Sequence, residues 1–62
     1  MTLLTHMEFG IAAAIFFEFS NKEIAEELHI TPACVKLHIF RIHEKLKTKS
    51  RREISNWILT MR

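Results

Sequence analysis

Two short helical patterns lie on either side of a turn within residues 20–46, and each begins with its own start signal. Ser20 and Glu23 form a capping box, in which the serine oxygen accepts a backbone N–H of the first turn and the glutamate accepts the N–H of the cap residue. Thr31 supplies an N-cap hydroxyl, and Pro32 favours the first helical position. Two short helices joined by a tight turn form a helix-turn-helix, whose second helix can enter the major groove of DNA. The predicted helices span residues 21–28 and 32–46.

Apolar residues recur at helical spacing in both predicted helices, so that each helix has one apolar face. These two faces can pack against each other, as a helix-turn-helix requires. The residues that form them are Ile24, Ala25 and Leu28 in the first helix, and Val35, Ile39, Ile42 and Leu46 in the second.

Two further capping boxes, Thr5 with Glu8 and Ser50 with Glu53, predict a helix on each side of this pair. A chain of 62 residues is long enough for one small domain, in which all helices must contribute to the core. We therefore predict an all-α fold, a small four-helix helix-turn-helix domain over residues 1–62. The two flanking helices are expected at approximately 6–19 and 51–61.

The charges are distributed unevenly along the chain, although the net charge is only +2. Residues 1–27 contain one lysine and five glutamates, whereas residues 28–62 contain eight lysines and arginines and two glutamates. The basic half begins close to the second predicted helix. This distribution favours an anionic partner such as nucleic acid, although a solvated helical face is the alternative.

Several classes of protein are not expected from the composition. The longest apolar run, residues 9–17, is far shorter than the roughly 20 residues that cross a bilayer, so we expect no membrane contact. The single cysteine, Cys34, cannot form an intramolecular disulfide, and a cytoplasmic location is expected.

Neither an enzyme nor a cofactor site is expected. One glycine cannot build a glycine-rich phosphate loop, and the four histidines lack a suitably spaced serine, aspartate or second cysteine. Cys34 and His38 lie one turn apart and His43 follows them, so a metal site could be drawn, but these residues match no ordinary zinc signature. We therefore predict no metal and no cofactor.

The first predicted helix is apolar on nearly all sides, which is unusual for a helix in so short a chain. One face contains Met7, Ile11, Ala14 and Ile15, and the opposite face contains Phe9, Ala13, Phe16 and Phe17. The second face is a candidate partner contact, unless the phenylalanines fold under the chain ends. Trp57, Ile58 and Met61 of the last helix are further candidates, although a core position is the favoured alternative for Trp57.

Over Leu4 to Ile58 the chain resembles the LuxR-type (GerE- or FixJ-type) DNA-binding domain of bacterial transcription regulators. The resemblance implies a four-helix helix-turn-helix domain that binds double-stranded DNA through its third helix and commonly forms a homodimer through its fourth. Such domains usually lie at the C-terminus of a longer regulator, so the chain could be a fragment of one. The residues that carry the resemblance are Leu4, Thr5, Glu8, the run SNKEIA at 20–25, Leu28, Ile30, Val35, Lys36, His38, Ile42, Lys45, Leu46, Arg51 and Glu53.

The resemblance also implies which residues contact DNA. Those expected to face the bases are Lys36, Leu37, Phe40 and Arg41, and helical geometry agrees, because they lie away from the apolar face. Those expected to contact phosphates are Ser20, Asn21, Lys22, Thr31, His38 and Lys45. For His38 the alternative is a packed, hydrogen-bonded side chain at the edge of the core.

The chain departs from the family pattern at several positions. Family members are usually polar where this chain has Met7, Phe9, Gly10, Ala13 and Phe17, which favours an additional contact on the first helix. They commonly have glycine near Glu18 and at the position of Lys47, so these turns must form without it. Leu37 and Phe40 are apolar, so direct readout would depend on thymine methyl groups together with Lys36 or Arg41.

Two other functions fit parts of the pattern. The promoter-recognition helix-turn-helix of sigma factors shares several elements, but His38 and the capping box at Ser50 favour the LuxR type. Alternatively, the chain is a degenerate helix-turn-helix that acts as a protein-interaction module, or as an antagonist of a full-length regulator, through its apolar first or last helix. Sequence-specific DNA binding in transcription regulation is the principal prediction.

Overall fold

Four α-helices make up most of the computed structural model, which describes residues 4–60. They are α1 (His6–Phe16), α2 (Asn21–Leu28), α3 (Pro32–Leu46) and α4 (Arg51–Thr60). The described residues contain no strand, so the predicted all-α class is confirmed. No helix among them has the length and apolar character needed to cross a membrane.

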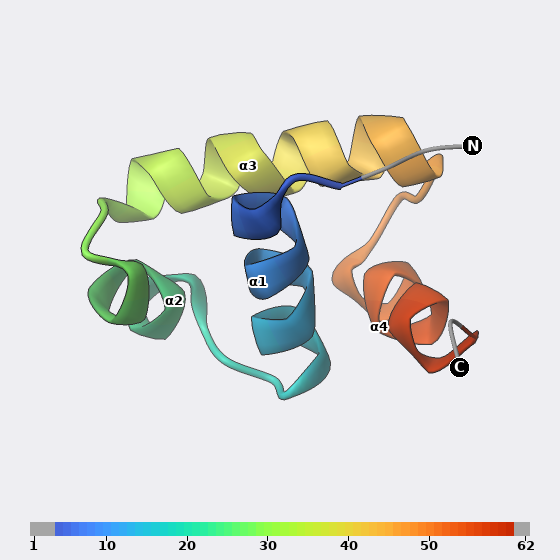
Figure 1. Cartoon of the computed structure of the whole chain (residues 1–62), viewed down its shortest axis with the longest axis horizontal. Helices are drawn as coiled ribbons and strands as arrows, with labels where there is room; N and C mark the ends of the chain where they lie inside the picture. The colour runs from blue at the N-terminus through green and yellow to red at the C-terminus, as the bar shows by residue number, and fades with distance from the viewer. Residues whose placement is uncertain (1–3, 61–62) are drawn as a thin grey trace.

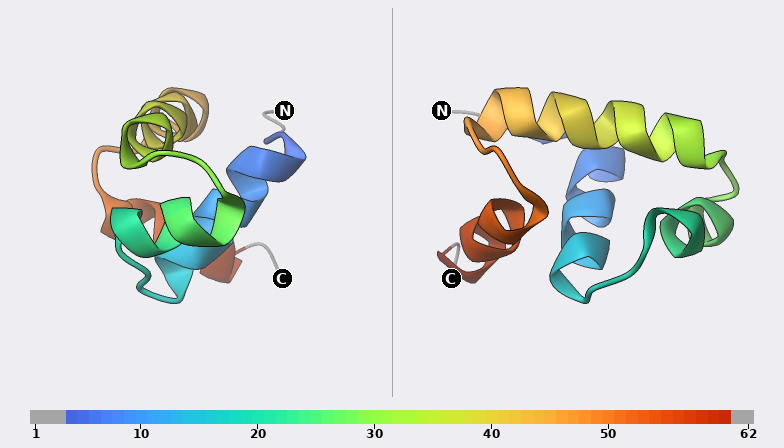
Figure 2. Two further views of the ribbon diagram at one scale, coloured as in Figure 1. Left: turned by 90° about the vertical axis from the view of Figure 1, so that its left-hand side faces the viewer. Right: turned by 180° about the vertical axis from the view of Figure 1, so that it is seen from behind.

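The longest helix, α3, runs along one side of the molecule, and the other three helices lie on the opposite side of its axis (Figures 1 and 2). α1 stands against the middle of α3 and packs on both α3 and α4, while α2 packs on α3. No other helix of the described chain covers the outer side of α3 (Figure 1). The packing therefore leaves one long helical face open to a partner.

The hydrophobic core receives residues from all four helices, as expected for so short a chain. The predicted apolar faces of α2 and α3 are buried, and Leu28 and Leu46 pack at the border of the core. In α1 the buried face is the one predicted from Ile11 and Ile15, joined by Ala12, whereas Met7 is exposed. The buried apolar side chains are Ile11, Ala12, Ile15, Ile24, Ala25, Val35, Ile39, Ile42 and Ile54.

The helix starts follow the cap signals of the sequence. The capping boxes of α1 and α2 are both complete, and Thr31 Oγ1 accepts the N–H of Cys34 with Pro32 in the first turn of α3. At Ser50 the predicted helix start is confirmed, because α4 begins at Arg51, but only half of the capping box forms. The Glu53 N–H lies 3.4 Å from Ser50 Oγ, and the described residues show no return bond from Ser50 N–H to Glu53.

The predicted end of the first helix, Phe19, is wrong, because α1 ends at Phe16. Glu18 adopts a left-handed conformation with φ 65°, and its N–H bonds to Ile15 O while the Phe19 N–H bonds to Ala14 O. This is a Schellman motif, in which the left-handed residue stops the helix and satisfies its last carbonyls. The residue type gives no local signal for this end, because the position lacks the usual glycine, and only the family resemblance indicates a turn near Glu18.

The ends of α2 and α3, the two helices of the helix-turn-helix, also use left-handed residues that are not glycine. His29 after α2 and Lys47 after α3 have φ 59° and 58°. The only glycine of the chain, Gly10, lies inside α1, where an added Cβ would meet nothing within 4 Å. The left-handed positions therefore carry side chains that make this conformation unfavourable, whereas the glycine occupies a position that does not need one.

Candidate nucleic-acid interface

The outer face of α3 presents the residues expected to contact bases. The core residues Val35, Ile39 and Ile42 point toward α1 and α2, so positions on the other side of the helix face solvent. All four predicted base-facing residues are exposed, with half of Leu37 and 59% of Phe40 accessible. The exposed set is Lys36, Leu37, Phe40 and Arg41. The structure thus brings together on one helix face what the sequence predicted.

The predicted phosphate contacts at the starts of α2 and α3 combine capping with accessible polar groups. Ser20 Oγ and Thr31 Oγ1 accept the backbone N–H groups of Glu23 and Cys34, which leaves each hydroxyl hydrogen free to donate. Lys22 is exposed on the first turn of α2. A helix N-terminus with exposed donors and a lysine favours an anion.

Asn21 is less free than its neighbours, because Arg51 of α4 holds it. Arg51 Nη1 donates to Asn21 Oδ1 at 2.7 Å, and Arg51 Nη2 donates to the carbonyl oxygen of Phe19 at 2.6 Å. This guanidinium fastens the start of α2 to the start of α4. No local sequence pattern indicates these contacts, because the partners are 30 and 32 residues apart.

His38 lies at the edge of the core, and its Nδ1 atom is buried without a hydrogen-bond partner among residues 4–60. The expected packed position is therefore found, but the expected hydrogen bond to this nitrogen is not. A phosphate contact from His38 would have to use the other ring nitrogen, Nε2.

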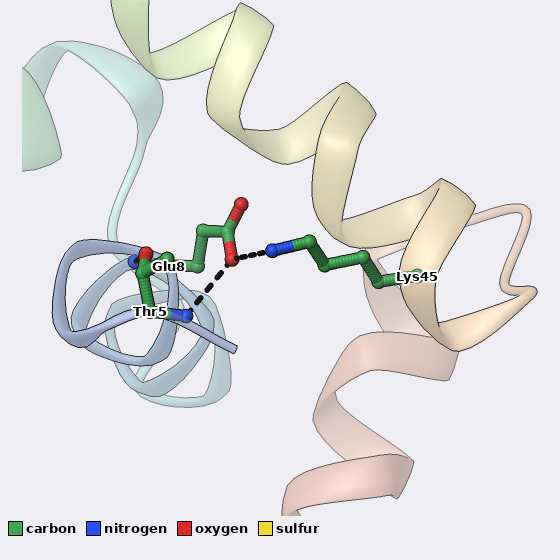
Figure 3. A network of polar contacts seen from close by, with 3 residues as sticks. All are labelled: Thr5, Glu8 and Lys45. Atoms are coloured by element: carbon green, nitrogen blue, oxygen red, sulfur yellow. Dashed lines mark hydrogen bonds and ion pairs between the residues drawn. The ribbon is translucent and has the colours of Figure 1, made fainter. Parts of the chain in front are cut away.

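Lys45 forms an ion pair inside the protein, which the sequence did not reveal (Figure 3). Its Nζ atom lies 2.6 Å from Glu8 Oε1, and the Thr5 N–H donates to the same oxygen at 2.9 Å. Glu8 is only 4% exposed, whereas 36% of the Lys45 side chain is accessible. The hydrogen bond from Lys45 holds the pKa of Glu8 below its ordinary value, as do the Thr5 N–H and the positive charge of Lys45, against the opposing effect of burial.

This ion pair connects α1 to the C-terminal part of α3, because Glu8 is both the third residue of α1 and its capping carboxylate. The Lys45 ammonium is thereby engaged within the fold. A phosphate contact by Lys45 stays a prediction, and it would compete with Glu8.

The family of the chain follows from comparison with known proteins. Residues 2–58 match the model of the LuxR family of bacterial regulatory proteins, also called GerE. The chain belongs to the LuxR family. This membership places it among the DNA-binding domains of transcription regulators, and α2 and α3 form its helix-turn-helix.

Three relatives illustrate how this LuxR-family domain compares with longer proteins. It is 36% identical over 50 residues to the HTH-type transcriptional regulator MalT of Vibrio campbellii, covering 81% of this chain and 6% of MalT. It is 36% identical over 55 residues to the CsgBAC operon transcriptional regulatory protein of Escherichia coli, covering 89% and 26%. It is 42% identical over 48 residues to the transcriptional regulatory protein LnrK of Bacillus subtilis, covering 77% and 22%. The matched segment is thus about a quarter or less of each relative.

The aromatic residues predicted as partner contacts on α1 and α4 of this LuxR-family domain meet in one place. Phe9 lies edge-on against Trp57, with ring centroids 6.5 Å apart and planes at 71°. Phe9 remains 42% exposed. Trp57 is half-buried, so it lies between the two predicted positions, the core and the surface. Phe9 and Trp57 therefore join the predicted contacts of the first and last helices, and we call the surface around these two residues the α1–α4 face.

The remaining predicted contacts differ in how much surface they offer. Phe17 is 68% exposed and packs edge-on against the half-buried Phe16, with ring centroids 5.1 Å apart. Ala13 is half-buried, and Ile58 packs against the core, so both offer less area. Met61 lies outside the described residues.

The residues drawn as a possible metal site do not form one among residues 4–60, where no group of three histidine, cysteine, aspartate or glutamate side chains is close enough to hold an ion. Cys34 is exposed on the first turn of α3. His43 instead bonds to Thr48, with 2.7 Å between Nδ1 and Oγ1. This contact supports the turn that follows α3.

Proposed function

We propose that the chain binds double-stranded DNA in a sequence-specific way as part of transcription regulation, with α3 in the major groove. The observation that carries this proposal is the outer face of α3, which no other described helix covers and which presents Lys36 and Arg41 to solvent. An α-helix fits the major groove of B-DNA, and lysine and arginine are the side chains that most often contact guanine there.

The starts of α2 and α3 support this placement of α3 in the major groove. Ser20, Lys22 and Thr31 are exposed polar residues at the two helix starts of the helix-turn-helix, and we assign them to phosphates. Contacts of this kind fix the position of a protein on the duplex but carry little sequence information. Asn21 and His38 are assigned the same role through the amide NH₂ group and Nε2, respectively.

We further propose that the domain binds DNA as a homodimer in the cytoplasm. The α1–α4 face and Phe17, which follows α1, support this proposal, because Phe9, Phe17 and Trp57 leave aromatic area accessible. A two-fold dimer places two recognition helices on neighbouring half-sites about one turn of DNA apart. Ile58 and Met61 are the further candidates for this contact.

A second candidate function uses the same aromatic face without DNA. A degenerate helix-turn-helix could pair with a full-length regulator through α1 or α4 and act as its antagonist. The exposure of Phe9 in α1 and of Phe17 directly after α1 favours this alternative, because a large exposed apolar surface often marks a protein contact.

The test is a binding selection from random duplex DNA at two salt concentrations. We expect one motif to be enriched, and its affinity to fall steeply as salt rises, because several phosphate contacts release counterions. If no motif is enriched and an apolar contact with another protein persists at high salt, the interaction module replaces the DNA-binding proposal.

Lys36→Ala and Lys49→Ala form a matched pair for this assay. Both remove one exposed lysine, but Lys36 lies on the outer face of α3, whereas Lys49 lies in the turn before α4. Lys36→Ala should weaken binding to the enriched duplex by about 1–3 kcal/mol if the side chain contacts a base. Lys49→Ala should have only a small, salt-sensitive effect. Equal effects of the two substitutions would contradict the proposed position of α3 in the major groove.

A further inference from the structure

The outer face of α3 contains a line of apolar side chains that the core does not use. Ala33, Leu37 and Phe40 follow one another at spacings of four and three residues, opposite the buried residues of the same helix. All three are exposed, and Leu37 and Phe40 expose more of their surface than most apolar side chains of this domain. We call these three residues the outer stripe of α3.

The charges around the outer stripe distinguish it from the α1–α4 face. Lys36 and Arg41 lie on either side of the stripe, and residues 32–43 contain no acidic side chain. The first acidic residue on this face is Glu44, which is exposed one turn beyond Phe40 and marks the end of the stripe. An apolar line between two cations fits a ligand with apolar groups on its floor and negative charge along both walls.

The major groove of DNA is such a ligand only where it contains thymine. The 5-methyl group of thymine is the one apolar group that an unmodified base pair presents in the major groove, whereas the other groups there are hydrogen-bond donors and acceptors. Leucine and phenylalanine cannot form hydrogen bonds with those polar groups. Burying the polar groups of the bases without hydrogen-bond partners is unfavourable.

We propose that the outer stripe of α3 recognises thymine methyl groups, so that the DNA half-site is rich in thymine opposite Leu37 and Phe40, with guanine only at the flanks that Lys36 and Arg41 reach. This inference rests on the proposed function, since it requires α3 in the major groove. It assigns specificity to two residues that make no hydrogen bond, and it assigns charge attraction and flanking guanine contacts to the two cations.

Deoxyuridine provides the test, because it pairs as thymidine does but lacks the 5-methyl group. The probe is the duplex enriched by the selection above, resynthesised with deoxyuridine at each thymidine in turn. We expect affinity to fall by about threefold to fivefold for each methyl group that contacts the stripe. Deoxyuridine in the flanks of the same duplex is the matched control and should change nothing.

Leu37→Ala and Phe40→Ala complete the test as a double-mutant cycle. Both side chains are exposed, so the variants should fold with unchanged helix content. Each should weaken binding to the thymidine duplex and lose little more when the matching methyl group is also absent. A C·G pair placed there should bind weakly and recover part of the loss when the cytosine carries a 5-methyl group.

Two outcomes would overturn the inference, and they are distinguishable. If a motif is enriched and bound but deoxyuridine has no effect on its affinity, the stripe does not recognise methyl groups, while the proposed DNA binding stands. If no duplex is enriched at either salt concentration, sequence-specific DNA binding itself fails, and the inference fails with it.

Discussion

Two exposed apolar surfaces of this domain differ in the charges beside them. The outer stripe of α3 lies between Lys36 and Arg41, whereas the α1–α4 face has both a basic and an acidic neighbour, because Lys47 and Glu53 line one surface hollow with Trp57. Apolar side chains between cations suit a polyanion with methyl groups, and aromatic side chains beside charges of both signs suit another protein surface. The comparison shows that exposure alone does not identify a ligand, because the surrounding charge decides which ligand fits.

A second difference concerns how firmly the basic side chains are held. Lys45 and Arg51 are half-buried and bonded to Glu8 and to Asn21, whereas Lys36 and Arg41 are exposed. Half-buried cations with fixed partners stabilise the fold, and exposed cations remain available to DNA. The following substitutions test this division, beginning with the largest expected effect.

Lys45→Met should lower the free energy of unfolding by about 2–3 kcal/mol, measured by urea denaturation, because it leaves the buried Glu8 carboxylate with only the Thr5 N–H. Glu8→Gln should cost less, since the freed Lys45 ammonium is partly exposed and can reach water. If Lys45→Met leaves stability unchanged but weakens DNA binding, Lys45 belongs with the phosphate contacts instead.

The same ion pair predicts how stability depends on pH. The pKa of Glu8 is lower in the folded protein than its ordinary value of 4.5. The ionised carboxylate therefore contributes fully to the free energy of unfolding above pH 4.5, and this contribution is lost as pH falls through the lowered pKa of the folded protein. Glu8→Gln should flatten the loss of stability in this acidic range, whereas Glu26→Gln, at an exposed position on α2, should not. Identical pH profiles for wild type and Glu8→Gln would contradict the ion-pair account.

Arg41→Ala and Arg51→Ala should affect different measurements. Arg41→Ala should reduce affinity for the enriched duplex by about 1–3 kcal/mol in fluorescence anisotropy and leave the unfolding midpoint unchanged. Arg51→Ala should lower the unfolding midpoint, because Asn21 and the Phe19 carbonyl lose their donor. An exchange of these two outcomes would refute the division between structural and DNA-facing cations.

Phe9→Ser and Phe17→Ser test the aromatic face. Each should reduce self-association in sedimentation equilibrium, and Phe9→Ser should also cost about 0.5–1.5 kcal/mol of stability through its lost contact with Trp57. Neither should change the affinity of one domain for a single half-site. If both variants keep the wild-type oligomeric state and partner binding, these phenylalanines do not form a protein contact.

Glu18→Gly and Lys47→Gly should each stabilise the domain by about 0.5–1 kcal/mol, because both residues adopt left-handed conformations that glycine tolerates better. Gly10→Ala should stabilise by about 0.5–1 kcal/mol for the opposite reason, since it replaces a helical glycine where a Cβ has space. Thermal unfolding measures all three. A loss of stability in Glu18→Gly would contradict the cost assigned to its backbone conformation.

The parts of the fold that the sequence predicted are those fixed by neighbouring residues. Cap signals and apolar spacing are local, so all four helix starts and the buried faces of α2 and α3 followed directly from them. The end of α1 was predicted three residues too late, because Glu18 adopts a left-handed conformation without the glycine that normally signals it.

The parts that could not be predicted depend on contacts distant in sequence. The Glu8–Lys45 pair joins residues 37 positions apart, and the Arg51 contacts span about thirty, so no spacing rule indicates them. The exposure of the four residues proposed to face bases was predictable, because it only requires the side of α3 opposite its apolar face. Which lysines and arginines remain free to bind phosphate was not predictable, because the folded packing decides it.

The wild-type protein already carries a probe of the central claim that α3 enters the major groove. Its single cysteine, Cys34, is exposed on the first turn of α3 and is available to a maleimide. We measure the rate of alkylation with a saturating amount of the enriched duplex, and with a scrambled duplex at the same concentration as the control. The account predicts that the enriched duplex strongly slows alkylation. An unchanged rate, while anisotropy shows the duplex bound, would place α3 outside the groove.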